Sequence, residues 1–344
     1  MENITLTGID LSKSVFEVRC ENRAGRLVDR KTLNRDKLFR YLELLPKGSQ
    51  VAMEACGSSH YWGKQVAGLG LKPVLITPQF VKAFRMSQKN DKNDATAICE
   101  AARRPGMRPV TLKNDAQLDM QARHRARERM IENRTKLINQ IRAFLLERGI
   151  TIPLGVSQFI KRMPGIVEEL GEQTDFGSLI SDSWAEFKQR DEDLAKCTRK
   201  IKAIARSNED CRKIMGISGV GEIVATALVA FVGKAEGFKN GRCLSAALGL
   251  VPRQYSTGGK TVLGGITKVG NGYIRKLLVH GARSVIFHTR MKKKEDKESL
   301  WIRTLYQRCG ANRTAVAVAN KIARKVWLVL RDKPPYTPSL PMAA

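Results

Sequence analysis

The order of β-rich and helical patterns in the first hundred residues constrains the fold more than any other feature of the chain. Three β-rich runs separated by short polar turns predict an antiparallel meander, at 4–9, 15–20 and 27–32. Helical and strand patterns then alternate, at 38–45, 50–55, 58–69, 73–76, 78–86 and from about 91. This βββαβαβα order predicts an α/β domain with a mixed sheet over residues 1–115.

Two long helical patterns follow and predict a connector over residues 116–210. The first runs from 116 to 148, with an apolar stripe in its second half and arginines, including Arg123 and Arg127, in its first half. In the second, apolar residues step by four and three between Ile180 and Ala205, the spacing of a coiled-coil seam. Because Asp191 and Thr198 interrupt the seam, both a helical hairpin or coiled coil and an ordinary amphipathic helix remain open.

The charge of the chain points to a polyanionic partner. The formal net charge is +28, and residues 251–334 hold 19 Lys and Arg but four Asp and Glu. Because hydrophobic residues make up 42% of the chain, it is expected to fold rather than to act as a disordered basic tail. These observations favour nucleic acid as the partner.

The same sequence argues against membrane and secreted classes. No apolar run approaches the roughly 20 residues of a membrane helix, and the first ten residues lack a secretory pattern. The seven cysteines are scattered without a Cys-x-x-Cys pair, which predicts reduced thiols in a cytosol and disfavours a zinc finger. We therefore expect no membrane partner.

Four acidic residues stand where the predicted strands and helices place them together. Asp10 ends the first strand, Glu54 ends the strand at 50–55, and Asp91 and Asp94 begin a helix three residues apart. Converging carboxylates repel one another unless a cation lies between them, and oxygen ligands suit Mg²⁺. Singly, Asp91 or Asp94 is more typical of a helix N-cap, and Asp10 of a turn. Together they predict a metal site for phosphodiester chemistry.

The region 211–334 is rich in glycine, helical by pattern and strongly basic, and residues 335–344 have the composition of a loose tail. The segment 216–221, Gly-Ile-Ser-Gly-Val-Gly, precedes an apolar helical pattern and is similar to a helix-hairpin-helix element. Backbone N–H groups at Gly219 and Gly221 could hold a phosphate. Alternatively, these glycines allow close helix packing.

A second glycine-rich segment places two hydroxyls between two cations. Ser256 and Thr257 lie in a stretch expected to form a flexible loop, with Arg253 before them and Lys260 after them. A hydroxyl there could attack a phosphodiester, because the cations would stabilise the charge of the transition state. Taken alone, the pattern favours a loop that grips phosphate.

Two motif sets together resemble a known family. Gly-Ile-Asp, Met-Glu-Ala and Asn-Asp-Lys-Asn-Asp-Ala in the first domain, and Gly-Leu-Val-Pro-Arg with the following hydroxyls in the last, are similar to DEDD transposases of the insertion sequence 110 family, including its insertion sequence 1111 branch. The resemblance covers roughly 4–115 and 210–330. It implies a RuvC-like, RNase H-fold catalytic domain in which Asp10, Glu54, Asp91 and Asp94 bind Mg²⁺ or Mn²⁺.

The resemblance also implies a serine nucleophile that forms a covalent intermediate with DNA. Ser256 and Thr257 both fit its position within one residue; Ser256 is preferred because a primary alcohol is less hindered. The implied partners are donor and target double-stranded DNA and an element-encoded guide RNA, called a bridge or seeker RNA. The implied assembly is a homotetramer built as a pair of dimers, in the bacterial cytoplasm and associated with the nucleoid.

The chain is thus expected to combine α/β and α regions and to act as a DNA transposase. Two alternatives remain: a metal-dependent Holliday-junction nuclease that uses only the four carboxylates, and a non-catalytic nucleic-acid-binding scaffold. The residues expected to contact nucleic acid are Arg123, Arg127, Gly219, Gly221, Arg253, Lys260, Lys268, Arg275 and Lys276.

Overall fold

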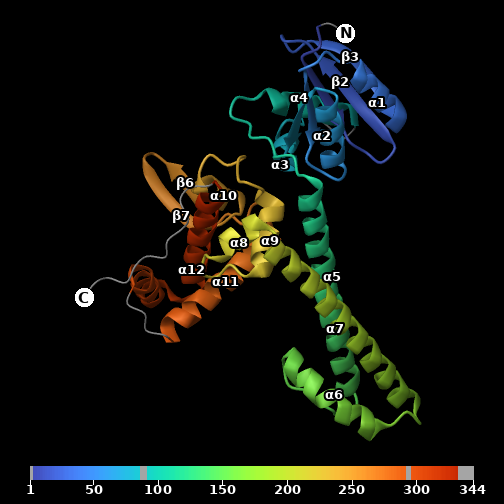
Figure 1. Ribbon diagram of the computed structural model, residues 1–344, viewed down its shortest axis with the longest axis vertical. Helices are drawn as coiled ribbons and strands as arrows, with labels where there is room; N and C mark the ends of the chain where they lie inside the picture. The colour runs from blue at the N-terminus through green and yellow to red at the C-terminus, as the bar shows by residue number, and fades with distance from the viewer. Residues whose placement is uncertain (1–2, 86–90, 292–295, 332–344) are drawn as a thin grey trace. The chain divides into compact units, whose positions relative to one another are not determined.

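The computed structural model describes residues 3–85, 91–291 and 296–331 and divides the chain into two compact units, 1–114 and 115–344 (Figure 1). The expected connector and the glycine-rich basic region both lie in the second unit. The predicted tail at 335–344 lies outside the described residues. None of the described helices combines the length and the apolar character needed to cross a membrane.

The first unit is a mixed five-stranded sheet in the order β3-β2-β1-β4-β5. Its strands are β1 (Leu6–Asp10), β2 (Val15–Glu21), β3 (Leu27–Asn34), β4 (Gln50–Glu54) and β5 (Lys72–Ile76). The first three strands form the predicted antiparallel meander, and β4 and β5 run parallel to β1. The expected α/β unit with a mixed sheet is therefore confirmed.

Helices cover both faces of this sheet. They are α1 (Arg35–Glu43), α2 (Ser59–Gly68), α3 (Pro78–Ala83) and α4 (Asp91–Arg103). Alternate residues of a strand point to opposite faces, so Ile9 and Met53 join the core under α1 and α2, whereas Leu6 and Ala52 join the core with α3 and α4. The result is a three-layer arrangement with the sheet in the middle.

The second unit begins with a helical hairpin. It contains α5 (Asp115–Leu146), α6 (Val156–Leu170) and α7 (Asp175–Ser207). Helices α5 and α7 lie side by side in opposite directions (Figure 1), and the two polar seam positions have arginine partners. Arg127 Nε donates to Thr198 Oγ1 at 3.0 Å, and Arg134 forms an ion pair with Asp191. The polar interruptions of the seam therefore hold the hairpin together.

Helix α6 lies between the two long helices, in a stretch for which the sequence predicted no helix. Phe159, Met163 and Ile166 are buried in one core with Leu137, Ile141 and Phe187, so α6 covers the end of the hairpin. Its pattern is weakened by Pro164 inside the helix and by Gly155 at its N-cap. These two residues disguise a helix that tertiary burial stabilises.

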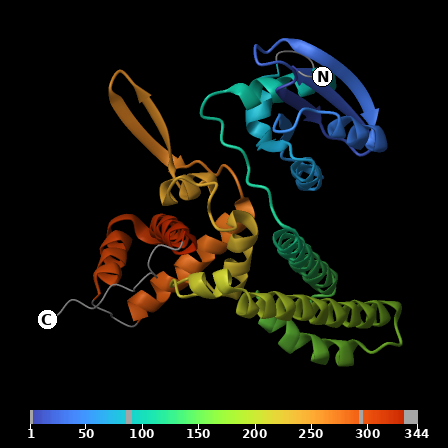
Figure 2. The same cartoon turned by 45° about the horizontal axis from the view of Figure 1, so that its top comes forward.

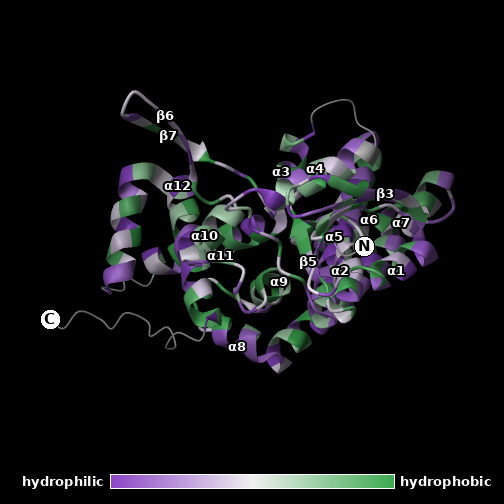
Figure 3. Ribbon diagram, turned by 90° about the horizontal axis from the view of Figure 1, so that it is seen from above, coloured by the Kyte–Doolittle hydropathy of each residue, from purple (hydrophilic) through white to green (hydrophobic). Residues whose placement is uncertain are grey.

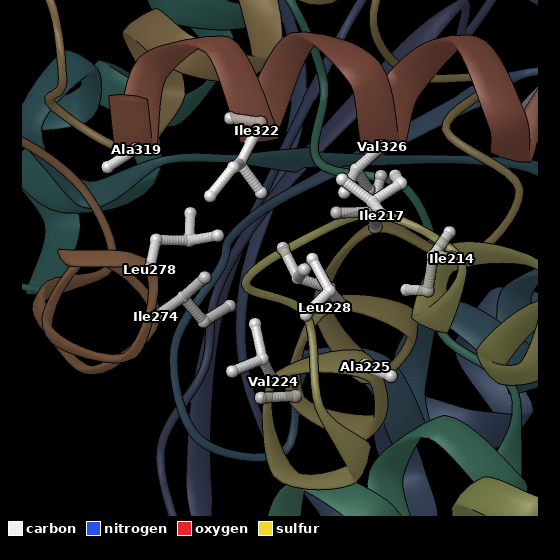
Figure 4. Packing of buried hydrophobic residues seen from close by; sticks show 14 of the residues in the cluster. Ile214, Ile217, Val224, Ala225, Leu228, Ile274, Leu278, Ala319, Ile322 and Val326 are labelled. Carbon is white, nitrogen blue, oxygen red and sulfur yellow. The ribbon is translucent and has the colours of Figure 1, made fainter. Parts of the chain in front are cut away.

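The remaining helices share one large core. They are α8 (Glu209–Met215), α9 (Glu222–Val232), α10 (Gly241–Ala247), α11 (Gly272–Met291) and α12 (Lys297–Leu330), the last interrupted by Gly310. Leu228, Leu278 and Ile322 meet between α9, α11 and α12 (Figure 4). Two strands, β6 (Pro252–Thr257) and β7 (Lys260–Ile266), form a separate ribbon that projects from these helices (Figures 1 and 2).

Candidate active site and nucleic-acid interface

The parallel pairing of β1 and β4 places Asp10 and Glu54 next to each other at the carboxyl ends of these two strands. Ile9 is the register partner of Met53, and each carboxylate residue comes next in its strand. Because neighbouring strands lie about 4.8 Å apart, the two residues end adjacent strands on the same side. The Cys56 thiol interacts electrostatically with both carboxylates. Burial raises the pKa of this thiol, and the negative charges of Glu54 and Asp10 raise it further.

Helix α4 brings Asp94 to the same layer. The helix packs against β1, and Gly8 makes the close approach possible: a Cβ at Gly8 would lie 2.5 Å from Cys99 Sγ and 2.8 Å from the Ala95 carbonyl oxygen. Asp94 directly precedes Ala95 and is only 6% exposed. The glycine of the Gly-Ile-Asp motif therefore sets the distance between the strand of Asp10 and the helix of Asp94.

The Asp94 carboxylate already has a cationic neighbour. Its Oδ1 forms an ion pair with Nε of Arg85, a residue that the sequence analysis did not single out. The guanidinium neutralises a carboxylate that is almost fully buried. Asp91 begins α4, but its side chain lies outside the described residues.

Within the described part of the chain, no three Asp, Glu, His or Cys residues form a group close enough to hold a metal ion. The donor chemistry nevertheless fits a hard cation, because every predicted ligand is a carboxylate and the buried one is paired with a positive charge. Asp10, Glu54 and Asp94 are the described residues that could contribute ligands.

The glycines of the 216–221 hairpin have different surroundings. Gly219 has a φ of +87°, and its carbonyl oxygen would lie 2.1 Å from a Cβ on Gly281 of α11, so this pair permits close packing between the hairpin and the helix. Gly221 is the N-cap of α9, and a Cβ there would meet no atom within 4 Å. Of the two, Gly221 is the one with open space beside its backbone.

Ser256 and Thr257 lie on a β-hairpin, which corrects the expectation of a flexible loop. Gly258 and Gly259, with φ of +52° and +76°, form its two-residue turn, and all residues from 252 to 265 are exposed. Ser256 pairs with Thr261, whereas Thr257 pairs with Lys260. Since successive strand residues point to opposite faces, the two hydroxyls project from opposite faces of the ribbon.

The surroundings of the two hydroxyls also differ. Ser256 Oγ accepts a hydrogen bond from Gln254 Nε2 at 2.7 Å. Lys260 lies across from Thr257 on the other face. The ribbon also contains hydrophobic residues, and Tyr255, Val262 and Leu263 are 60–65% exposed. Figure 3 shows the hydropathy of each residue along this ribbon and the rest of the chain. An isolated two-stranded ribbon of this kind gains little stability by itself. Exposed apolar side chains on such a ribbon are typical of a surface that contacts a partner.

The base of the hairpin is held firmly. Gly249 and Gly270 have positive φ, and a Cβ on Gly270 would lie 1.9 Å from the Ala247 carbonyl oxygen, so the two chain segments cross closely there. Arg275 Nη1 donates to the carbonyl oxygens of Leu248 and Val269 at 3.0 and 3.1 Å. The ribbon thus projects from a fixed base.

The cations expected to bind nucleic acid fall into two overlapping groups. Those that are exposed are Arg123, Arg253, Lys260, Lys268 and Lys276. Three have intramolecular partners: Arg127 donates to Thr198, Arg275 donates to carbonyl oxygens at the base of the hairpin, and Lys276 Nζ lies 2.6 Å from Glu128 Oε1. Arg127 and Arg275 thus help to hold the fold, and the contacts of all three residues with nucleic acid stay predictions.

A buried histidine network ties together three helices of the second unit. His124 Nε2 lies 2.9 Å from Thr226 Oγ1, and His124 Nδ1 lies 2.9 Å from the Tyr273 hydroxyl. Because Thr226 donates to the Glu222 carbonyl oxygen at 2.8 Å, it accepts from His124, and Tyr273 donates. Burial, with a contribution from Arg127, lowers the pKa of His124 to about 4. The neutral imidazole therefore acts as a structural link.

Comparisons with known proteins agree with the two motif sets. Residues 7–149 match a family model described as Transposase, and residues 211–297 match the model of the Transposase IS116/IS110/IS902 family. The transposase for insertion sequence element IS1111A of Coxiella burnetii is 40% identical over 98% of this chain and 92% of its own length.

Two further relatives are similar over nearly their whole length. A probable family 20 transposase of Pseudomonas aeruginosa is 40% identical over 98% of this chain and 99% of its own. The transposase for insertion sequence element IS1328 of Yersinia enterocolitica is 37% identical over 96% of this chain and 97% of its own. The chain therefore belongs to the IS110/IS116 family of insertion-sequence transposases, enzymes that cut and rejoin DNA.

Proposed function

We propose that this transposase cuts DNA with a metal-binding set formed by Asp10, Glu54, Asp91 and Asp94 in a RuvC-like, RNase H-fold domain, together with a serine nucleophile, Ser256. The observation that carries the proposal is the register of β1 and β4, in which Asp10 and Glu54 lie side by side at the ends of neighbouring strands. The meander followed by parallel strands and covering helices supports the fold assignment.

The carboxylate set supplies ligands for divalent cations. Bound Mg²⁺ or Mn²⁺ would polarise the scissile phosphate and stabilise the charge on the attacking and leaving oxygens. Asp10 and Glu54 would hold such ions from the strand ends and Asp94 from α4, where Gly8 allows the helix to approach. Arg85 would release the Asp94 carboxylate when that ligand is needed.

Ser256 carries the covalent step. Its Oγ attacks the phosphorus of a phosphodiester, a P–Oγ bond forms, and the P–O3′ bond breaks. The electron pair of the broken bond stays on O3′, which takes up the proton that the serine hydroxyl loses. The hydrogen bond from Gln254 supports Ser256 in this role, because a donor to Oγ stabilises negative charge there. Thr257, opposite Lys260, is the alternative nucleophile.

The remaining proposals concern partners. The net charge of +28 and the exposed Arg123, Arg253 and Lys268 support contacts with the backbones of donor and target DNA. The family resemblance supports an element-encoded bridge or seeker RNA that selects both DNAs by base pairing, and a homotetramer built from two dimers. In this arrangement the protein grips phosphates and the RNA reads sequence.

Substitution and co-purification test the proposal. Asp10→Asn and Glu54→Gln, which keep size and remove charge, are expected to abolish cleavage of donor-end DNA while leaving DNA binding intact. Ser256→Ala is expected to abolish cleavage as well. Undiminished cleavage by the Ser256→Ala, Thr257→Ala variant would instead favour a junction nuclease. Sequencing of RNA that co-purifies with the protein tests the guide; highly pure, active protein without RNA would contradict it.

A further inference from the structure

A basic cavity lies in the first unit, at the end of the sheet opposite the proposed carboxylate set. A cavity of about 710 Å³ opens at the amino ends of β1, β4 and β5. Four cationic side chains line it, namely Arg23, Lys47, Lys72 and Arg103. No Asp or Glu is among its lining residues in the described part of the chain. The cavity is therefore strongly positive.

The position of the cavity separates it from the proposed reaction. Leu6 of β1 and Gln50 of β4 line the cavity, whereas Asp10 and Glu54 end the same strands four residues later. At about 3.3 Å per strand residue, about 13 Å of sheet separates the two edges. One phosphodiester group cannot contact both, so a phosphate held in the cavity is not the one that reacts.

One polar group in the cavity has no protein partner. Ser49 lines the cavity and is 8% exposed, and its Oγ has no hydrogen-bond partner among the described residues. A buried hydroxyl without a partner is costly, and an acceptor oxygen entering the cavity would satisfy it. This observation points to an oxygen-bearing anion independently of the cations.

The cations differ in how they are held. Arg103 forms an ion pair with the buried Glu21 and so belongs to the framework. Lys47 Nζ donates to the Leu69 carbonyl oxygen at 2.8 Å, which keeps two further N–H groups for a ligand. Arg23 and Lys72 are exposed at the cavity, where they can follow a chain of phosphates beyond it.

We propose that this cavity binds the phosphodiester backbone of a nucleic acid strand other than the one being cut. The wide opening, the rim cations and the buried hydroxyl favour a polymer of phosphates over a single enclosed anion. The inference rests on the membership of the chain in a DNA-processing family and not on the covalent step. The same chemistry recognises DNA and RNA, and the experiment separates them.

The test compares two charge-matched variants of the full-length protein. Lys47→Gln, Lys72→Gln removes two cavity cations, and Lys37→Gln, Arg40→Gln removes two exposed cations of α1 in the same unit. Binding to a fluorescent 30-bp duplex and to a fluorescent RNA hairpin is measured across a salt series. Thermal unfolding of both variants confirms that they are folded.

We expect the cavity variant to bind at least one of the two probes less tightly and to flatten the slope of log K against log salt by about 0.9 per lost phosphate contact on duplex DNA. The α1 variant is expected to keep the wild-type slope, and Lys47→Arg, Lys72→Arg to restore it. The probe that responds identifies the strand. An unchanged slope for both probes, or equal losses in the two variants, would overturn the proposal. Cleavage of a pre-bound donor end at saturating protein should stay at the wild-type rate in the cavity variant, so failure of this site is separable from failure of the catalytic proposal.

Discussion

The guanidinium of Arg85 forms an ion pair with the carboxylate of Asp94, the most deeply buried of the described predicted metal ligands. A cation thus already lies beside a group expected to bind Mg²⁺. The pairing offsets part of the cost of burying an acidic side chain that is only 6% exposed. It also predicts competition between the side chain of Arg85 and a divalent ion.

Replacement of Arg85 tests this competition. Arg85→Gln leaves the Asp94 carboxylate buried without its cation, so we expect a loss of about 3 kcal/mol in the free energy of unfolding. Mn²⁺ should restore more stability to this variant than to the wild type, because binding to the folded state raises the melting temperature. Thermal unfolding with and without Mn²⁺ measures both effects. If the double variant Arg85→Gln, Asp94→Asn gains as much stability from Mn²⁺ as Arg85→Gln alone, Asp94 is not a ligand.

Gly8 offers a second test, of the approach between β1 and α4. Gly8→Ala places a Cβ 2.5 Å from Cys99 Sγ and 2.8 Å from the Ala95 carbonyl oxygen, so we expect a loss of about 2 kcal/mol in stability and a strong loss of cleavage. Adding Cys99→Ala should recover part of the stability. Gly68→Ala is the matched control, because nothing lies within 4 Å of its Cβ. Wild-type urea unfolding of Gly8→Ala would contradict the close approach.

The buried His124 predicts a loss of stability in acid. Burial lowers its pKa in the folded protein to about 4, below the ordinary value of 6.5. Above pH 6.5 the imidazole of His124 is neutral in both the folded and the unfolded state. As the pH falls toward 4 the unfolded state binds a proton first, which costs the folded state up to about 3 kcal/mol.

Urea unfolding between pH 4.5 and 7 measures this dependence. His124→Gln is expected to be less stable at pH 7, because the hydrogen bonds to Tyr273 and Thr226 are altered, but to lose less stability on acidification. His280→Gln, at an exposed position, should follow the wild-type curve. An unchanged pH dependence in His124→Gln would show that another group titrates.

Arg275 distinguishes a clamp from a phosphate contact. Its bonds to the carbonyl oxygens of Leu248 and Val269 hold the base of the β6–β7 hairpin. We expect Arg275→Gln to make residues 252–266 more sensitive to limited proteolysis. The control Arg242→Gln, at an exposed position of α10, should leave this sensitivity unchanged. If proteolysis stays at the wild-type rate while the salt slope of DNA binding falls, Arg275 contacts phosphate instead.

Much of the first unit follows from its sequence. The alternation of apolar residues in β1 and β4 fixes which side chains enter each core, and the short turns of the meander fix its antiparallel pairing. The order of elements then places Asp10 and Glu54 at one edge. Helix α6 and the β6–β7 ribbon were not predicted, because Pro164 and the glycines around Ser256 weaken the local patterns and the tertiary contacts decide.

The site was predictable only in part. Carboxylates at strand ends follow from topology, but Arg85 gives no signal in the sequence, because its role depends on a contact with Asp94 that only the fold creates. The same holds for the basic cavity, whose Arg23 and Lys47 come from two separate turns and whose Lys72 begins β5. Opposite orientations for Ser256 and Thr257 likewise required the strand that the sequence pattern concealed.

The most direct test of the account is to find the protein residue that carries DNA. Protein incubated with a nicked donor-end substrate, which cannot be rejoined, is denatured, digested and mapped by mass spectrometry. We predict a 5′-phosphate linked to Oγ of Ser256, lost in Ser256→Ala and retained in Thr257→Val. Linkage to any other residue, or efficient cleavage without a covalent protein–DNA adduct, would contradict the proposed mechanism.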